Sequence, residues 1–420
     1  MNNNQNVLIG AIDQSTTSTK FGVFDQQGNL IDIDIIPHDQ ISQHPGWLEH
    51  NPQQILNNLH TSINNLVSRL QEKGYSLSDL KTIGVTNQRE TVVAWNKHTG
   101  KPYYNAIVWC DNRTQYVCEK FTQQHAGNSN IYQNITGLPI SQLKMFNKQE
   151  MSQILMLFLG LWILGLYGEL KIPINTLPIV LASSDNYGTI KEGTLKGKQI
   201  QSCLGDQQAA ALGHGVLNIG DCKTTFGSGS FLLVNIGEKP IYKEGGLLTT
   251  ILYKLGKNQP TFYAFEGSIE VGGSTLNWAK ENLGLFKDYE ELASLIEQTQ
   301  DNGNVYFVPA LNGLLCPYWQ SGAQGIISGI SFYTKKEHIL RALLEGIAFR
   351  TKDVIVNIEQ STEMKIDLLK VDGGLTKISE STMLGVAFAA GIFSFNQDNN
   401  NKNQVLYQNW LDTVNKSINK

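Results

Sequence analysis

The sequence contains the same local pattern twice, and this repetition constrains the fold more than any other feature. The pattern is two short apolar strands joined by a turn of small polar residues. Its first copy, IGAIDQSTTSTKFGVFD, covers Ile9–Asp25, and its second copy, DCKTTFGSGSFLLVNIGEKPI, begins at Asp221. Because each copy opens one half of the chain, we predict a duplicated α/β domain with a cleft between the copies. We place the boundary in GHGVLN (Gly213–Asn218), which gives domains 1–215 and 216–420.

Strand and helix patterns alternate along the chain, as in a layered α/β fold. A helix is predicted after Asn51, a candidate N-cap that is followed by Pro52. Its buried face comprises apolar residues at helical spacing: Ile55, Leu59, Ile63, Leu66 and Leu70. The stretches LKTIGVTNQRE, TVVAWN and AIVWCDNRT are predicted as strands. In the second half, Thr334 and Glu337 form a candidate capping box before another helix with an apolar face.

Composition and charge exclude several classes of protein. The formal net charge is -4, and no run of Lys or Arg provides a basic patch for a nucleic acid. The five cysteines are scattered and lack CxxC spacing, so neither a disulfide framework nor a zinc site is predicted. The residues MNNNQNVLIGAI do not form a signal peptide, and the apolar run Ile154–Gly168 is too short to cross a membrane. We therefore expect a cytoplasmic protein without a membrane span.

The polar turns of the two copies are candidate phosphate-binding sites. The first turn is rich in Ser and Thr, which provide hydroxyl and backbone N–H donors for an anion, and Asp13 at its base is suited to hold a cation. For either copy alone, a solvated turn is the alternative. The second turn, FGSGS (Phe226–Ser230), favours phosphate, since a pair of such turns can bind a polyphosphate from both sides. The sequence has no GxxxxGK[ST] motif and no HRD or DFG element, so it is neither a P-loop protein nor a protein kinase.

Polar residues at predicted strand ends and helix starts supply further candidates. Arg89 and Glu90 end a strand in NQRET, where they can bind the hydroxyls of a polyol or form a solvated charge pair. Asp206 precedes an alanine-rich helix in LGDQQAAALGHG, as an N-cap, as a base that accepts a hydroxyl proton, or as both. The paired glycines of VDGGLTK and EVGGSTLNW let a ligand approach the backbone or the start of a helix, although such pairs also occur in plain turns.

These motifs together resemble the FGGY family of carbohydrate kinases, and within it the members that phosphorylate glycerol. The matching stretches follow the family's order over nearly the whole chain: DQSTTSTK, HPGWLEHNP, GVTNQRETVVAWNKHTGKPYYNAIVW, DNRT, GDQQAA, FGSGSFLLVNIGE, GGLLTTI, YFVPALNGLLCPYW, HILRALLEGIAFRTKDV and VDGGLTK. The resemblance implies an α/β, actin-like ATPase fold, with two ribonuclease-H-like domains around a nucleotide cleft. It also implies ATP-dependent phosphorylation of glycerol with Mg²⁺, and self-association into homo-oligomers.

The resemblance also assigns roles to individual positions. Asp206 looks like the general base that accepts the proton of the attacking glycerol hydroxyl. The other glycerol contacts that the resemblance implies are Arg89, Glu90, Trp109, Gln207 and Phe231. The positions that match nucleotide contacts or lie in the first polar hairpin are Ser15, Thr16, Thr17, Lys20, Ser228, Gly273, Asn277 and Gly374. Asp13 matches the carboxylate that orients magnesium.

The sequence departs from the family pattern at single positions and over two segments. Ser15 replaces a glycine, Lys20 an arginine, Leu143 a tyrosine that contacts substrate, and Ile378 an asparagine near the nucleotide. The chain is also shorter than the family between TGLPIS and LASSDNYG and between GGLTK and TMLGVAFAAG. Three alternatives therefore stay open: a kinase for another small polyol or sugar, a catalytically inactive binding or regulatory protein derived from a kinase, and a shortened reading of a longer gene.

Overall fold

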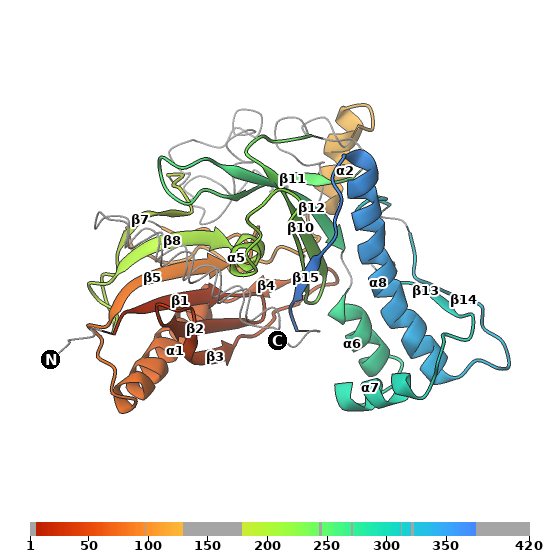
Figure 1. Ribbon diagram of the computed structural model, residues 1–420, viewed down its shortest axis with the longest axis horizontal. Helices are drawn as coiled ribbons and strands as arrows, with labels where there is room; N and C mark the ends of the chain where they lie inside the picture. Colours follow the sequence, from red (N-terminus) through yellow and green to blue (C-terminus); the bar gives the residue numbers. More distant parts are fainter. Residues whose placement is uncertain are drawn as a thin grey trace. The chain divides into compact units, whose positions relative to one another are not determined.

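The computed structural model describes residues 6–96, 98–128, 179–242, 246–269, 272–311, 313–320 and 323–374. Of these residues, those up to Gly215 and those of Ile251–Phe262 form one compact unit, called unit 1. The residues of Val216–Thr250 and those from Tyr263 onward form a second, called unit 2. Figure 1 labels the helices and strands of both units.

Unit 1 is built on a six-stranded sheet with the strand order β3-β2-β1-β5-β8-β7. The strands are β1 (Leu8–Gln14), β2 (Ser18–Phe24), β3 (Leu30–Pro37), β5 (Leu80–Asn87), β7 (Ser184–Thr189) and β8 (Gln199–Gly205). β1, β2 and β3 are antiparallel neighbours, whereas β5 runs parallel to both β1 and β8. The register pairs Gln14 with Asn87 and Asn87 with Gly205. The carboxyl ends of β1, β5 and β8 therefore meet at one edge of the sheet.

Helix α1 (Pro52–Glu72) packs along β2 and β3 (Figure 1). The side chain of Asn51 accepts hydrogen bonds from the backbone N–H groups of Gln53 and Gln54, which confirms the predicted N-cap. The apolar face of α1 lies in a core shared with the sheet: Phe21, Val23, Ile63, Leu66, Leu70 and Ile83. Unit 1 also contains the helices α2 (Gln115–Gln124) and α5 (Asp206–Gly213).

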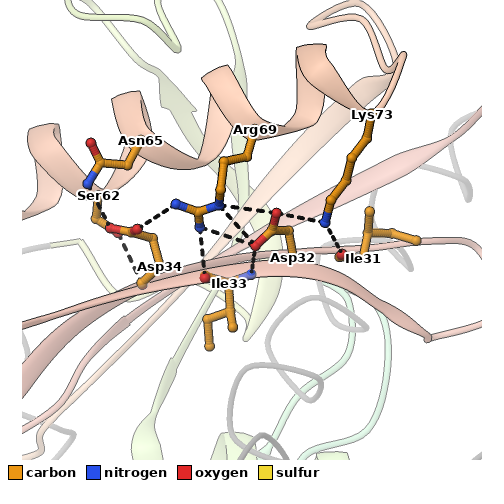
Figure 2. A network of polar contacts seen from close by, with 8 residues as sticks. All are labelled: Ile31, Asp32, Ile33, Asp34, Ser62, Asn65, Arg69 and Lys73. Atoms are coloured by element: carbon orange, nitrogen blue, oxygen red, sulfur yellow. Dashed lines mark hydrogen bonds and ion pairs between the residues drawn. The ribbon is translucent and has the colours of Figure 1, made fainter.

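A charged network joins α1 to the edge strand β3 (Figure 2). The guanidinium of Arg69 lies between the carboxylates of Asp32 and Asp34, at 3.1 Å from the first and 2.9 Å from the second. The ammonium of Lys73 donates to Asp32 over 2.8 Å. These contacts hold the helix in register on a strand that has only one neighbour, β2, in the described part of the sheet.

Two short strands, β4 (Glu49–His50) and β6 (Ala106–Ile107), form a separate antiparallel pair in unit 1. The prediction of strands over TVVAWN and AIVWCDNRT is therefore only partly correct. In the first stretch Val92 and Trp95 form isolated bridges, and in the second only the first two residues belong to a strand. Within the described residues neither stretch has a continuous partner strand, and the backbone leaves the extended conformation at Glu90, whose φ is 61°, just before TVVAWN.

A second sheet, with the strand order β11-β12-β10-β9-β15, belongs to unit 2 except for the residues of Ile251–Tyr253 and Phe262, which are counted in unit 1. Its strands are β9 (Cys222–Phe226), β10 (Ser230–Gly237), β11 (Leu248–Tyr253), β12 (Phe262–Ile269) and β15 (Leu369–Asp372). β9 and β10 form the antiparallel hairpin predicted around FGSGS, and β15 runs parallel to β9. Helix α8 (Lys336–Ser361) packs on this sheet through a buried apolar cluster: Cys222, Leu232, Val234, Phe265, Val354 and Ile358.

A second apolar cluster of unit 2 joins α8 to two shorter helices and a small hairpin. These elements are α6 (Gly273–Glu281), α7 (Tyr289–Glu297), β13 (Tyr306–Val308) and β14 (Ile326–Ser328). α8 begins at Lys336 with Lys335 as its N-cap, so the predicted capping box of Thr334 and Glu337 is wrong. The Thr334 hydroxyl instead accepts a hydrogen bond from the backbone of Ser331 and stabilises the turn that precedes the helix.

None of the described helices is both long and apolar enough to cross a bilayer. The apolar run Ile154–Gly168 lies outside the described residues.

Candidate active site

Two residues predicted to act on a polyol lie side by side at the carboxyl edge of the unit 1 sheet. Arg89 follows β5 and Asp206 follows β8, and these strands are parallel neighbours. The Nε atom of Arg89 lies 3.6 Å from Oδ1 of Asp206, and both side chains are partly accessible. Gly205 permits this approach, because a Cβ atom there would lie 2.7 Å from Cγ of Arg89. The edge thus presents a cation and a carboxylate together.

Asp206 is the first residue of α5, and Gly205 is the N-cap of that helix. The interpretation of Asp206 as the N-cap is therefore wrong by one residue, because its backbone is already helical. Its Oδ1 atom accepts a 2.7 Å hydrogen bond from the backbone N–H of Gln207, whose side chain is buried. The positive end of the helix dipole favours an ionised carboxylate at this position, as a proton acceptor requires.

Glu90 has a strained backbone. Its φ of 61° lies in the left-handed region, which residues other than glycine adopt rarely and at a cost of about 1–3 kcal/mol. Such strain persists only where the surrounding structure imposes it, and it is frequent at ligand-binding sites. At the end of β5, it allows Arg89 and Glu90 to leave the sheet together.

The first polar turn joins β1 to β2 at this same edge, because β1 ends there beside β5. The turn is closed by a 3.0 Å hydrogen bond from the backbone N–H of Ser15 to the carbonyl oxygen of Ser18. Ser15 is not among the described non-glycine residues that have a positive φ, so the serine adds no strain of that kind to the turn. Thr16 is half-buried and Thr17 is exposed.

Asp13 and Lys20 lie opposite each other across the β1–β2 hairpin. The Nζ atom of Lys20 is 3.3 Å from Oδ2 of Asp13, a residue that is 1% exposed. The other oxygen of Asp13, Oδ1, is buried and has no hydrogen-bond partner within the described residues. Leaving a carboxylate oxygen in that state is costly unless a cation or a donor completes it. Asp13 therefore fits the magnesium ligand that the sequence predicts, since Mg²⁺ is commonly bound by one or two carboxylates together with substrate phosphates.

Trp109 connects the two predicted sets of unit 1 residues. Its indole Nε1–H donates to Oγ1 of Thr16 over 3.0 Å, and its backbone N–H donates to Oγ1 of Thr91 over 3.2 Å. A residue predicted to contact glycerol is thus bonded directly to one predicted to contact the nucleotide.

In unit 2, the second polar turn is bonded to the start of α6. The carbonyl oxygen of Gly227 accepts a 2.8 Å hydrogen bond from the N–H of Gly273. The carbonyl oxygen of Ser228 accepts from the N–H groups of Gly272 and Ser274, at 2.8 and 3.1 Å. These N–H groups therefore hold the turn against the start of α6. The side chain of Ser228 is exposed.

The third glycine motif reaches the same turn. Gly373 follows β15 with a φ of +100°, and a Cβ atom there would lie 2.4 Å from the carbonyl oxygen of Phe226. Only glycine fits at this position. Gly374 next to it is exposed, and so is Asn277 on α6. The motifs FGSGS, EVGGST and VDGGLTK therefore gather at one end of the unit 2 sheet.

Phe231, the remaining predicted polyol contact, is the second residue of β10 and is partly exposed. It lies between Thr225 of β9 and Ser268 of β12 in the sheet register. The predicted site residues thus form one group in each unit. Leu143, Ile378 and the two shortened segments lie outside the described residues.

Attack by a cysteine thiol and metal binding by a cluster of side chains are two other kinds of chemistry that a site can perform. Burial raises the pKa of the Cys222 and Cys316 thiols to about 12, so these thiols stay protonated at neutral pH and are unsuited to nucleophilic attack. Among the described residues, no group of three or more His, Cys, Asp and Glu side chains is placed to hold a metal ion.

No individual role was predicted for several residues that surround the first turn. They are Gln40, His50, Gln88 and Thr91, and their side chains are hydrogen-bonded to the turn or to one another. Three of them lie in the motifs HPGWLEHNP and NQRET. The motifs marked these segments, but only the fold shows which atoms the side chains contact.

Two family models match the chain. The model for the N-terminal domain of the FGGY family of carbohydrate kinases matches residues 8–149, and the model for the C-terminal domain of that family matches residues 222–383. Together these matches cover more than half of the chain.

Curated relatives of the chain are glycerol kinases. That of Chloroflexus aurantiacus is 37% identical over 452 residues, which cover 91% of this chain and 89% of the relative. That of Azorhizobium caulinodans is 36% identical with the same coverage. The alignment of 452 positions is longer than the chain of 420 residues, so the relatives contain residues that have no counterpart here. This agrees with the shortened segments noted in the sequence.

Solved structures give the same result. The structure of Plasmodium falciparum glycerol kinase with ADP matches with a TM-score of 0.80 and 30% identity, over 96% of this chain and 92% of that chain. A xylulose kinase from Lactobacillus acidophilus matches with a TM-score of 0.76 at 18% identity, over 98% of both chains. The second likeness shows the fold alone. Together with the family models, these matches confirm the predicted fold class.

Proposed function

The chain belongs to the FGGY family of carbohydrate kinases, and from that premise we propose that it transfers the γ-phosphoryl group of ATP to a terminal hydroxyl of glycerol. The observation that carries the proposal is the pair of Arg89 and Asp206 beside the hydroxyl-rich turn of β1 and β2. This edge of unit 1 combines a carboxylate that can accept a proton, a guanidinium that can bind a hydroxyl group, and a turn whose hydroxyl and N–H groups can donate hydrogen bonds to phosphate oxygens. The glycerol kinases among its relatives support glycerol as the acceptor.

Asp206 acts as the general base. Its carboxylate accepts the proton of the glycerol hydroxyl while the hydroxyl oxygen attacks the γ-phosphorus in line with the bond to ADP. The P–O bond to the β-phosphate breaks, and the electron pair leaves with ADP. The products are glycerol 3-phosphate, ADP and a proton. Because this transition state needs little covalent help from the protein, positioning and charge neutralisation supply most of the rate.

The polyol contacts follow from the chemistry of the side chains. The guanidinium of Arg89 donates to neighbouring glycerol hydroxyls, and the carboxylate of Glu90 accepts from them. Gln207 provides an amide in the same helical turn as the base. Trp109 in unit 1 and Phe231 in unit 2 supply apolar surface for the carbon backbone of glycerol.

The nucleotide contacts come from both units. In unit 1, the turn residues Ser15, Thr16 and Thr17 offer hydroxyl and N–H donors to phosphate oxygens, and Lys20 adds a positive charge. In unit 2, the proposed contacts are Ser228, Gly273, Asn277 and Gly374. The amino-terminal domain of residues 1–215 thus holds most of the polyol site and the carboxy-terminal domain of 216–420 most of the adenine nucleotide site. We propose a cytoplasmic enzyme, in keeping with the use of ATP.

Magnesium, as the Mg²⁺ salt of ATP, is the cation that suits Asp13. The feature that supports its role is the Oδ1 atom of this carboxylate, which has no hydrogen-bond partner in the part of the chain that the structure describes. When bound, the ion would neutralise charge on the phosphate oxygens. The Nζ atom of Lys20 lies 3.3 Å from Oδ2 of Asp13 and orients this carboxylate.

The replacement of Asp206 by Asn tests the proposal. Asn keeps the size of the side chain but cannot accept a proton, so we expect glycerol-dependent formation of ADP to fall by about 10²–10⁴-fold, mainly in kcat. Asp185→Asn is a matched control, because Asp185 also accepts a hydrogen bond from the N–H of the next residue but lies on β7. Activity of Asp206→Asn equal to that of Asp185→Asn would rule out the proposed base. If the chain phosphorylates another polyol and not glycerol, the proposed substrate is wrong, but the proposed role of Asp206 as the base is unaffected.

A further inference from the structure

Six residues of unit 1 form a closed ring of hydrogen bonds around the first polar turn. In order around the ring they are Thr16, Gln40, His50, Gln88, Thr91 and Trp109. The successive donor–acceptor distances are 2.9, 2.9, 3.3, 3.0, 3.2 and 3.0 Å. The ring includes one proposed nucleotide contact, Thr16, and one proposed glycerol contact, Trp109.

The chemistry of the atoms fixes the direction of each bond in the first half of the ring. The backbone carbonyl of Thr16 can only accept, so the Gln40 atom that faces it is the amide nitrogen. The other amide atom of Gln40, Oε1, then accepts from Nε2–H of His50. The Nδ1 atom of His50 is left with a lone pair, which accepts from the amide nitrogen of Gln88. His50 must therefore be neutral, with its proton on Nε2.

In the second half of the ring two bonds keep this direction and the last one is reversed, so that Trp109 donates on both of its sides and Thr16 accepts on both. Oε1 of Gln88 accepts from the hydroxyl of Thr91, and that hydroxyl oxygen accepts from the backbone N–H of Trp109. The indole N–H of Trp109 donates to Oγ1 of Thr16. Because Thr16 uses a lone pair in this last bond, it can donate its own hydroxyl proton to a ligand.

The surroundings of His50 favour the protonation state that the ring requires. Its side chain is fully buried, and that of Gln88 is nearly so. Burial and the neighbouring His38 lower the pKa of His50 to about 4. The two imidazole rings meet edge to face with their centroids 4.6 Å apart. His38 itself donates from Nε2 to the carbonyl oxygen of Thr16 over 2.8 Å, so the turn is held by a second histidine.

We propose that His50 is a positioning residue for the phosphoryl transfer, an inference that rests on the proposed function. His50 orients Gln40 and Gln88, which hold the carbonyl oxygens of Thr16 and Ser15. It thereby fixes the first polar turn relative to Trp109 and to the strand end that carries Arg89. One buried imidazole, without touching either substrate, sets the geometry of both groups of contacts in unit 1.

Two replacements of His50 test this role in the full chain. Phe fills the volume but makes neither hydrogen bond, so we expect His50→Phe to raise the KM for both ATP and glycerol by about tenfold. Gln has a donor and an acceptor at nearly the separation of the two imidazole nitrogens, so His50→Gln is expected to restore most of the loss. His44→Phe is the matched control, because His44 lies in the same segment but is exposed and outside the ring.

Gln40→Met gives a second, independent test, because Gln40 is exposed and its replacement does not disturb the core. If the ring acts as a unit, breaking it at one residue already produces the full rise in KM. The double variant of His50→Phe and Gln40→Met should then have a KM similar to that of either single variant. Should His50→Phe fail to fold, Gln40→Met alone is expected to raise the KM for ATP, and a KM equal to that of the unmodified chain would overturn the proposal.

Two results with folded His50→Phe would overturn it as well. One is a KM for ATP and for glycerol within about twofold of the unmodified chain. The other is a double variant whose losses multiply. Failure of the proposed function would look different, since the unmodified chain would then show no glycerol-dependent turnover at all.

Discussion

Gly205 affects the polyol site because its lack of a side chain leaves room for Arg89. The side chain of Arg89 crosses its Cα on the way to Asp206, and a Cβ atom would lie 2.7 Å from Cγ and 2.8 Å from Cδ of Arg89. The φ of Gly205 is -66°, so the backbone itself accepts any residue. The steric effect on Arg89 can therefore be tested without backbone strain.

We expect Gly205→Ala to fold and to bind glycerol poorly. The new methyl group displaces the middle of the Arg89 side chain, which should raise the KM for glycerol by about tenfold and change kcat less. The KM for ATP, measured in the same assay, is the internal control and should stay within about twofold. An unchanged KM for glycerol would show that Arg89 does not need its present path.

His50 gives a second prediction at this scale, for stability against acid. Its folded-state pKa of about 4 lies below the ordinary histidine value of 6.5, so between these pH values the unfolded chain binds more protons. Stability therefore falls as the pH drops from about 6.5 to about 4. The pKa of the neighbouring His38 is also lowered, mainly by burial, and adds to the loss in the same direction.

His50→Gln removes one of these titrations. Urea unfolding at about pH 7.5 and about pH 5 should show that the variant loses less stability on acidification than the unmodified chain, by on the order of 1 kcal/mol. An equal loss in both proteins would mean that His50 titrates normally.

Single residues also show what the sequence could and could not reveal. The local patterns place Asp13 and Arg89 near strand ends and Asp206 at the start of a helix, and the structure has them there. The ring around His50 was not predicted. Its members lie up to 93 positions apart in the chain, and a hydrogen bond over that distance leaves no local pattern.

At the scale of secondary-structure elements, the contact between α1 and β3 depends on the charges shown in Figure 2. Burial by itself would raise the pKa of Asp32, but hydrogen bonds from Arg69 and Lys73 outweigh it, and the net effect is a lowered pKa. A carboxylate with a lowered pKa stabilises the fold above its unfolded-state pKa, and this contribution is lost as the pH falls.

Arg69→Met is expected to weaken this contact. The variant leaves Asp32 and Asp34 close together without the guanidinium between them, so the free energy of unfolding at neutral pH should fall by about 1–2 kcal/mol. The midpoint of urea unfolding measures the loss. Lys365→Met removes a charge from a highly exposed ion pair with Asp367 and should leave the midpoint unchanged. Equal midpoints for the two variants would contradict the role given to the network.

The predicted elements are confirmed where neighbouring residues determine the structure, and they are wrong where it depends on a pairing partner elsewhere in the chain. The cap at Asn51 and both polar hairpins are set by neighbouring residues, and the structure confirms them. TVVAWN has the composition of a strand but lacks a continuous partner. The paired glycines at the start of α6 predict close approach of a ligand, and only the fold shows that the N–H groups there bond the carbonyl oxygens of the second turn. Pairing of this kind is a property of the folded chain and leaves no trace in the local sequence.

At the scale of the whole molecule, the chain keeps the chemistry of its family while the relatives contain residues that it lacks. The proposed base, the proposed polyol pair and the carboxylate suited to magnesium are all present in unit 1, where Arg89 lies beside Asp206 and Lys20 beside Asp13. Retention of these groups favours an active kinase over a binding protein that has lost catalysis. The two polar turns predicted a duplicated α/β domain, and the resemblance to the family specified the actin-like form of that fold.

The most direct test of this account is to follow the phosphorus of ATP in the presence of the full chain, Mg²⁺ and glycerol by ³¹P nuclear magnetic resonance. We predict that ADP and glycerol 3-phosphate appear in equal amounts, that both require glycerol, and that neither forms at a comparable rate with Asp206→Asn. Binding of ATP without any product, or release of inorganic phosphate that does not depend on glycerol, would contradict the assignment.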